Sequence, residues 1–227
     1  MIRGLLLALA ASVALGACAP APREAPIGPR APAGFPEQVY RQAVRTGQAV
    51  YRIEAASSLA VFEVHRGGAL ARLGHDHVIA SHEVAGYVDP AAKRADLYVT
   101  LSSLTVDEPK LRAAAHFDTQ PSADDIAGTQ RNMRLHVLDV ARYPFARIAI
   151  RSAGNDLVDA DITLHGVTRT VHVPVRVAVR ADSLDVNGDF VIRQTEFGIA
   201  PLSVLGGAVR VEDEVSIRFM LHARRLQ

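Results

Sequence analysis

The sequence Gly74-His75-Asp76-His77 is the densest group of side chains in this chain that could do chemistry. If a strand begins at His77, the imidazoles of His75 and His77 project to the same side, about 7 Å apart along the chain. Two histidines at this spacing bind zinc or copper when a third ligand joins them, and His82 or Asp76 is the candidate. His82 lies an odd number of residues from His77, so a bulge or turn has to bring it to the same face.

Two other uses of this element compete with a metal site. In one, Gly74 to His77 is a turn in which Asp76 and the histidines cap backbone donors. In the other, His75 and His77 line the mouth of a cavity and donate hydrogen bonds to the polar head of a lipid or quinone. Because a portal needs only donors and no coordination geometry, we expect a portal or turn role here in preference to a tight metal site.

The sequence lacks the motifs of covalent and phosphate chemistry. It has no Gly-x-Ser-x-Gly elbow and no glycine-rich phosphate loop, and His82-Glu83 is not followed by the second histidine of a zinc protease motif. The only cysteine, Cys18, precedes the region of strand patterning. We therefore expect a protein that is not an enzyme and has no catalytic residues.

The N-terminus has the features of an export signal. Arg3 is followed by the apolar run Leu5 to Leu15, which is too short to span a bilayer permanently and ends in Leu15-Gly16-Ala17-Cys18. This ending resembles the lipobox of bacterial lipoproteins, which implies a signal peptide over residues 1–17 and a lipid on Cys18. The alternative is an ordinary secretory signal. Ala19 in place of Asp resembles the sorting signal for the outer membrane, so we expect a periplasmic protein anchored there.

A proline-rich segment follows the cysteine. Six of the chain's 12 prolines lie between Pro20 and Pro36, which predicts an extended, unpacked tether over residues 18–47. The folded domain is then expected over residues 48–227. Its formal net charge is close to balanced, at +1 for the whole chain, so composition gives no reason to expect nucleic acid as a partner.

The patterning after residue 48 is that of an all-β domain with one helical insertion. Residues alternate with a period near two over 50–66, 78–88 and 94–104, and again in five or so segments from Ile148 onward. Between them, Ser122 is placed to cap a helix from Ala123 to Leu138, with a short helix before it near Leu111. Turns are expected at 154–156 and at Asn187-Gly188. Such a meander fits a closed antiparallel barrel.

Five landmarks, in order along the chain, resemble the YceI-like family. They are Tyr51-Arg52-Ile53-Glu54, Leu138 to Pro144, Leu164-His165-Gly166-Val167-Thr168, Thr195 to Ile199 and Val211 to Val215. The resemblance implies an extended, lipocalin-like antiparallel β-barrel of about eight strands, which holds a long isoprenoid or other amphiphile without covalent catalysis. The His-Asp-His element departs from the commonest family pattern, which more often has a histidine at the position of Arg66.

The leading hypothesis is therefore an envelope lipoprotein that binds or carries a polyprenyl lipid or quinone. Alternation predicts that the cavity wall includes Phe62, Val64, Ile148 and Phe197, with His75 and His77 at the portal. No cofactor is expected other than such a bound lipid; the expected partners are this ligand, the membrane through the anchor, and a second copy of the chain as a candidate dimer. The competing hypotheses are a periplasmic metal-binding protein using His75, His77 and His82, and a structural or stress-response protein with a filled barrel.

Overall fold

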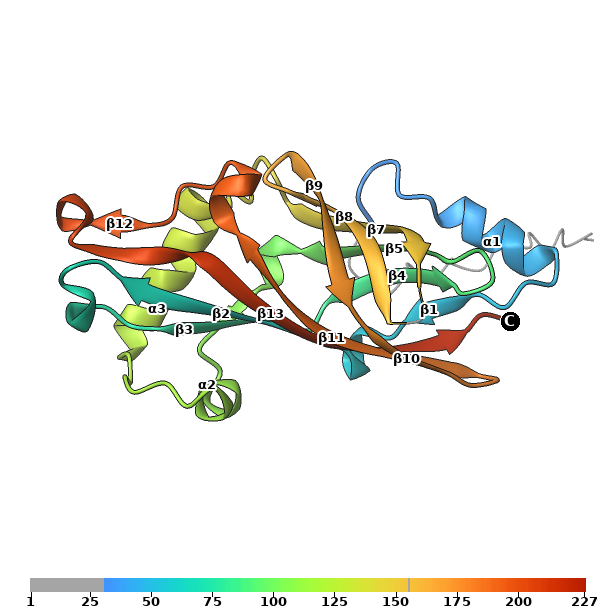
Figure 1. The fold of residues 1–227 in the computed structure, drawn as a ribbon, viewed down its shortest axis with the longest axis horizontal. Helices are drawn as coiled ribbons and strands as arrows, with labels where there is room; N and C mark the ends of the chain where they lie inside the picture. Colours follow the sequence, from blue (N-terminus) through green and yellow to red (C-terminus); the bar gives the residue numbers. More distant parts are fainter. Residues whose placement is uncertain (1–30, 155) are drawn as a thin grey trace, which may run out of the picture.

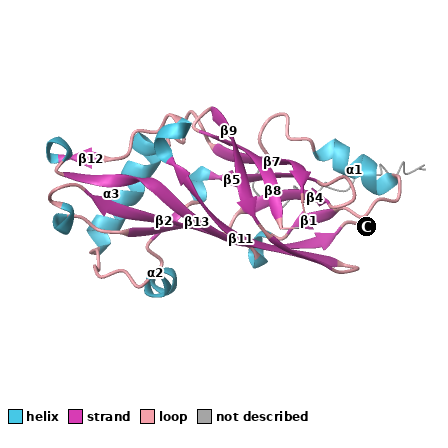
Figure 2. Cartoon of the chain, viewed as in Figure 1, coloured by secondary structure: helices cyan, strands magenta, loops and turns pink. Residues whose placement is uncertain are grey.

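Alternating apolar and polar residues produce strands along most of the chain, and these strands join in one antiparallel sheet. The computed structural model describes residues 31–154 and 156–227, and the sheet in this part of the chain has 13 strands. Figures 1 and 2 show an elongated molecule built mainly of strands, with its helices at the periphery. No helix within the described ranges is long and apolar enough to cross a membrane.

Several strands are interrupted pieces of longer ones. The strands are β1 (Tyr51–Ile53), β2 (Leu59–Gly67), β3 (His77–Ser81), β4 (Val84–Asp89), β5 (Arg94–Thr100), β6 (Thr105–Val106), β7 (Phe145–Ala153), β8 (Leu157–Leu164), β9 (Val167–Pro174), β10 (Arg176–Val179), β11 (Ser183–Arg193), β12 (Ser203–Val204) and β13 (Val209–Arg225). Short breaks separate β1 from β2, β3 from β4, β5 from β6, and β9 from β10. Joining these four pairs and setting aside the two-residue β12 leaves eight strand positions. The predicted all-β, lipocalin-like fold of about eight strands is confirmed.

The sheet curls until its ladders meet. β1 pairs with β4, and the order then runs through β5, β7 and β8 to β9. β9 continues through Val175 into β10, which pairs with β11; β11 pairs with β13, and β13 pairs with β1. At the other end, β13 pairs with β2, which continues the sheet through β3 to β6. The walls of a barrel therefore surround the apolar faces of these strands.

The β8–β9 hairpin closes through a very short turn. Leu164 pairs with Val167 across the two-residue turn His165-Gly166, and both turn residues have positive φ, 52° and 78°. This is the backbone that short hairpin turns require, because it matches the twist of the strands. The hairpin therefore places Ala160 and Ile162 on the buried face and Thr163 and Thr168 on the outside.

The helical insertion lies between β6 and β7. It comprises α2 (Pro109–Ala115), α3 (Ala123–Asn132) and a π-helical turn, η4, at Met133–Val137. Ser122 and Asp125 form a reciprocal capping box at the start of α3, so the predicted helix start is confirmed. Figure 1 shows α3 crossing the end of the barrel that also carries β12, opposite the end that carries α1.

The prediction of an extended, unpacked tether over residues 18–47 is wrong for the C-terminal part of that range. Residues 37–45 form a helix, α1 (Glu37–Arg45), whose Tyr40 is only 1% exposed. The Tyr40 hydroxyl donates a 2.6 Å hydrogen bond to Asp96, and its ring stacks on Tyr87. Pro32 is also buried, so the packed part of the chain begins well before residue 48. Residues 1–30, including Cys18, lie outside the described residues.

The predicted turn at Asn187-Gly188 is also wrong. Both residues lie inside β11, where Asn187 pairs with Met220 and Gly188 with Phe219. A Cβ atom on Gly188 would lie 2.3 Å from the carbonyl oxygen of Pro174. Glycine is needed here because two backbone segments approach closely, and this contact brings the end of β9 against β11.

Candidate ligand cavity

The barrel encloses an apolar cavity of about 540 Å³. Its lining comes from both halves of the barrel and from η4, and consists almost entirely of Val, Ile, Leu, Ala, Phe and Met side chains. Along β8 the lining extends from Val158 to Leu164, and the six steps between these residues span about 20 Å at the usual rise of a strand. The volume lies in the range of small-molecule sites, about 300–1,000 Å³. The filled barrel of the structural hypothesis is therefore not what the chain forms.

The cavity has one open end. The exposed residues of its lining are Lys93, Gly154, Val177 and Val179, which come from the β4–β5 turn, the β7–β8 turn and β10. In Figure 1 these elements lie at the end of the molecule that carries α1 and the C-terminus. At the opposite end the lining includes Met133, Val137 and Leu138, all buried or half-buried. The helical insertion therefore closes the inner end, and the two turns and β10 frame a mouth.

Polar side chains are rare in the lining. They are Asp89, Lys93 and Arg94 at the mouth and Gln194 deep inside. The Gln194 amide nitrogen donates a 2.9 Å hydrogen bond to the carbonyl oxygen of Glu212, so its position is fixed. A guest in this cavity would meet hydrocarbon along most of its length and charge at the mouth only.

A cluster of polar side chains on the outside of the barrel stabilises the structure next to the mouth. Asp96, on β5, is 4% exposed and accepts hydrogen bonds from Tyr40, Arg94 and Arg151. Burial raises the pKa of Tyr40, and its hydrogen bond to Asp96 adds to the rise, so the phenol remains a donor at neutral pH. This cluster attaches α1 to the outer face of β5, next to the mouth.

The predicted wall residues divide into two pairs. Phe62 and Ile148 are part of the lining. Val64 and Phe197 are not, and for them the expected position on the cavity wall is wrong. Phe197 is fully buried in the short helix Gln194–Phe197 rather than in a strand.

The His-Asp-His element does not reach the cavity lining, so its predicted portal role is wrong. His77 Nδ1 lies 2.6 Å from a carboxylate oxygen of Asp107, and its Nε2 lies 3.3 Å from the hydroxyl of Thr129 on α3. Asp107 also accepts hydrogen bonds from the backbone N–H of Val78 and from Arg112 of α2. We call these residues the His77–Asp107–Arg112 network. It ties both helices of the insertion to the edge of the sheet.

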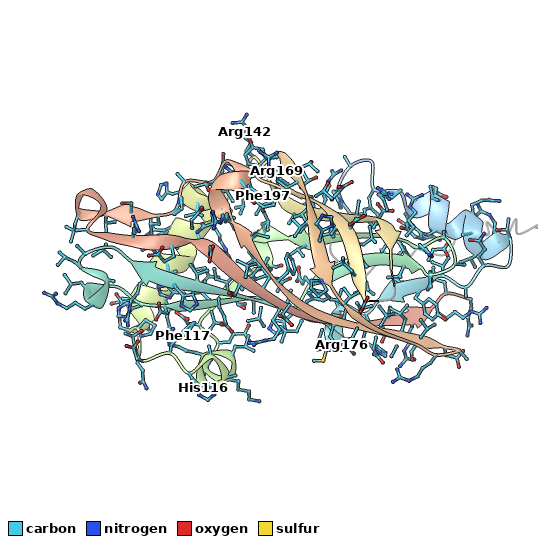
Figure 3. All side chains as sticks on the ribbon, viewed as in Figure 1. His116, Phe117, Arg142, Arg169, Arg176 and Phe197 are labelled. Carbon is cyan, nitrogen blue, oxygen red and sulfur yellow. The ribbon has the colours of Figure 1, made fainter. Side chains whose placement is uncertain are left out.

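Asp107 is the centre of this network and its side chain is fully buried. Burial alone would raise the pKa of its carboxyl group, but the hydrogen bonds from His77, Val78 and Arg112 outweigh that effect and the pKa is lowered. Arg112 also donates to the carbonyl oxygens of Asp76 and Thr119 and lies 5.5 Å from the ring of Phe117, labelled beside α2 in Figure 3. The charge of Asp107 is therefore used to position the insertion.

The predicted metal site does not form in the described part of the chain, where no three His, Cys, Asp or Glu side chains are grouped to hold an ion. His75 Nε2 lies 3.7 Å from Asp125, and its buried Nδ1 has no hydrogen-bond partner. His82 pairs instead with Glu108 at 2.8 Å. The turn role is the one observed, because Asp76 accepts a 2.9 Å hydrogen bond from the backbone N–H of Arg66.

Sequence reasoning missed the mouth. The residues that frame it, among them Lys93, Arg94, Val177 and Val179, come from segments far apart in the sequence: the β4–β5 connection, the β7–β8 turn and β10. The one available signal was local: Asp89-Pro90 begins a turn, and charged residues follow it. That signal could not show which other turns lie at the same end of the barrel.

Comparisons with known proteins agree with this architecture. The family model of the YceI-like domain matches residues 51–223. A solved polyisoprenoid binding domain from Saccharophagus degradans is similar in fold, with 15% sequence identity, a TM-score of 0.56 and coverage of 78% of this chain and 98% of that one. BcnA from Burkholderia cenocepacia has 19% identity, a TM-score of 0.52 and coverage of 75% and 98%. No curated protein sequence matches the chain.

Proposed function

The chain belongs to the YceI-like family, and from this we propose that it is an envelope lipoprotein whose barrel binds or carries a hydrophobic, isoprenoid-type ligand. The family match and the cavity support a hydrophobic guest. The neighbour from Saccharophagus degradans is described as a polyisoprenoid binding domain, which favours a polyprenyl lipid or quinone among such guests.

The observation that carries this proposal is the long apolar cavity with a single charged mouth. Each methylene taken out of water contributes on the order of 0.8 kcal/mol, so about ten buried methylenes contribute roughly 8 kcal/mol before the ligand's loss of freedom is counted. A tail can therefore bind here with very few polar contacts. We propose that the protein binds its ligand without catalysing a reaction, because the described lining contains no serine, cysteine or histidine.

Mass spectrometry of an organic extract tests the ligand. Protein purified from its native host should release a long-chain lipid, and the same protein carrying Phe62→Arg should release much less, because a charge beside the tail is poorly solvated. Val191→Arg is the matched control, since Val191 is 51% exposed and lies outside the lining. Wild-type protein that is folded by circular dichroism, releases no lipid and takes up no polyprenyl probe would exclude the carrier function.

The anchor and the location form the second part of the proposal. They rest on the lipobox ending in Cys18 and on Ala19 after it. Several acyl chains on one cysteine attach a protein to a bilayer far more firmly than one chain does. Cys18→Ser should therefore move the protein from the outer-membrane fraction to the soluble periplasmic fraction. Unchanged membrane fractionation of this variant would count against the anchor and leave the ligand proposal untouched.

A further inference from the structure

The charged residues of the cavity lining all lie in one turn. Asp89, Lys93 and Arg94 belong to the connection between β4 and β5, at the mouth. The rest of the described lining has one polar side chain, Gln194. Whatever charge the cavity offers to a ligand is therefore concentrated at the point where the head of an inserted amphiphile would lie.

The acidic residue of this turn, Asp89, already has a hydrogen-bond partner within the turn. Asp89 is 4% exposed, and its Oδ1 accepts a 3.0 Å hydrogen bond from the backbone N–H of Ala92. Lys93 N–H donates a 3.2 Å hydrogen bond to the carbonyl oxygen of Pro90 and so closes the same turn. Asp89 therefore helps to close the turn through its Oδ1 atom.

The basic members leave positive charge unpaired. Lys93 is exposed, and its ammonium group makes no ion pair or hydrogen bond within residues 31–154 and 156–227. Arg94 bonds to Asp96 through Nε at 3.0 Å, but the same carboxylate also binds Arg151 at 2.9 Å. Two guanidinium groups share one carboxylate, so Arg94 and Arg151 together carry one more positive charge than Asp96 neutralises.

The turn holds Lys93 in an unusual conformation. Its φ is 49°, in the left-handed region that side chains other than Gly, Asn and Asp rarely adopt. Glycine or asparagine would fit this backbone at lower cost. Lysine here thus contributes a charge that the turn itself does not need, since the turn is closed by Asp89 and the backbone.

We propose that the mouth binds an anionic head group, a phosphate or a carboxylate, through Lys93 with support from Arg94. The proposal rests on the proposed lipid-binding function and names the ligand class within it: a long-chain amphiphile with an acidic head. A neutral quinone or alcohol lacks this interaction. Val177 and Val179, exposed at the same opening, contact the first carbons of the tail.

Two probes with the same polyprenyl tail test this, one ending in a phosphate and one in an alcohol. Binding is measured to the full mature chain with Cys18→Ser, which leaves the barrel intact and removes the anchor. The phosphate probe should bind about tenfold more tightly than the alcohol, because a charged partner strengthens its hydrogen bonds. That preference should weaken at high salt, which screens an exposed ion pair.

Lys93 and Lys110 are the only lysines of the chain, so they provide a matched pair of variants. Lys93→Asn suits the positive φ and removes the charge; it should reduce the preference for phosphate about threefold to fivefold, the usual effect of one exposed ion pair. Lys93→Arg should retain the preference. Lys110→Asn, on the exposed surface of α2 and outside the lining, should leave it unchanged.

The remaining outcomes separate this inference from the function it rests on. Equal affinity for the two probes, or an equal effect of Lys93→Asn and Lys110→Asn, overturns the acidic-head assignment while tail binding stands. Inorganic phosphate alone binding as tightly as the phosphate probe also overturns it, because the site would then not recognise a lipid. Failure of both probes to bind overturns the proposed function itself.

Discussion

The cavity and the His77–Asp107–Arg112 network use opposite chemistry. The cavity wall is hydrocarbon with charge only at its mouth, whereas the network buries a carboxylate between an imidazole and a guanidinium. The residues that suggest catalysis or metal binding turn out to hold the helical insertion on the sheet. The residues with no reactive group form the site. In this barrel, reactive side chain types are a poor guide to the location of function.

The two regions are nevertheless connected through the insertion. The network holds α2 and α3, and α3 continues into η4, whose Met133 and Val137 line the inner end of the cavity. The polar contacts of the network, outside the barrel, thus position apolar side chains that line the cavity inside it. Variants on each side of this connection should separate what stabilises the fold from what binds the ligand.

The largest effect is expected from Asp107→Ala. It removes the only carboxylate that pairs with the Arg112 guanidinium among the described residues, and it leaves the N–H of Val78 without its acceptor. Removing one member of a buried ion pair typically costs about 3–5 kcal/mol, and we expect a loss of this size in the free energy of unfolding by urea. Asp118→Ala is the control: Asp118 pairs with Arg66 but is 71% exposed, so its loss should cost less than about 1 kcal/mol. Equal costs would mean that the network is not what holds the insertion.

A second variant fills the cavity without touching the network. Ala160 is 2% exposed and part of the lining, so Ala160→Phe should take the place of about three tail methylenes and lower the affinity for a long-chain probe by roughly 50-fold. Stability should hardly change, because the ring enters existing space. In a packed core the same substitution would cost about 1–3 kcal/mol. Calorimetry and urea unfolding on the same sample, with the exposed Ala141→Phe as control, distinguish these cases.

The smallest expected effect is a dependence of stability on pH that arises from the Asp107 carboxyl group of the network. The folded-state pKa of Asp107 lies below its ordinary value of 3.8, so its stabilising contribution is complete above that value and is lost as the pH falls through the folded pKa. The free energy of unfolding of the wild type should therefore decrease more steeply on acidification than that of Asp107→Asn. Parallel curves for the two proteins would show that this carboxylate does not stabilise the fold through its charge.

Local sequence signals predicted the fold well because they depend on near neighbours. The helix that begins at Ala123 forms with Ser122 as its cap, as expected. Period-two alternation placed Phe62 and Ile148 on the cavity wall. It failed for Phe197, which lies in a short helix where alternation has no meaning. Val64 pairs with Val215, next to the register shift between β2 and β13, and lies outside the cavity.

The remaining errors concern contacts between distant segments. The packing of α1 depends on Tyr40 reaching Asp96, 56 residues away in sequence, and the high proline content nearby gave no sign of it. The sequence leaves a portal, a turn and a metal site open for His77, because its partners, Asp107 and Thr129, are supplied by other elements. The mouth is assembled from two turns and β10, which only the closed barrel brings together.

Affinity measured against tail length, at constant head group, tests the account most directly. For saturated probes with one phosphate head, binding to the mature Cys18→Ser chain should strengthen about fourfold for each added methylene, the equivalent of about 0.8 kcal/mol. The gain should stop once the tail fills the cavity, and it should stop at a shorter tail in Ala160→Phe. Affinity that does not depend on tail length in the wild type would contradict a cavity that binds apolar chains.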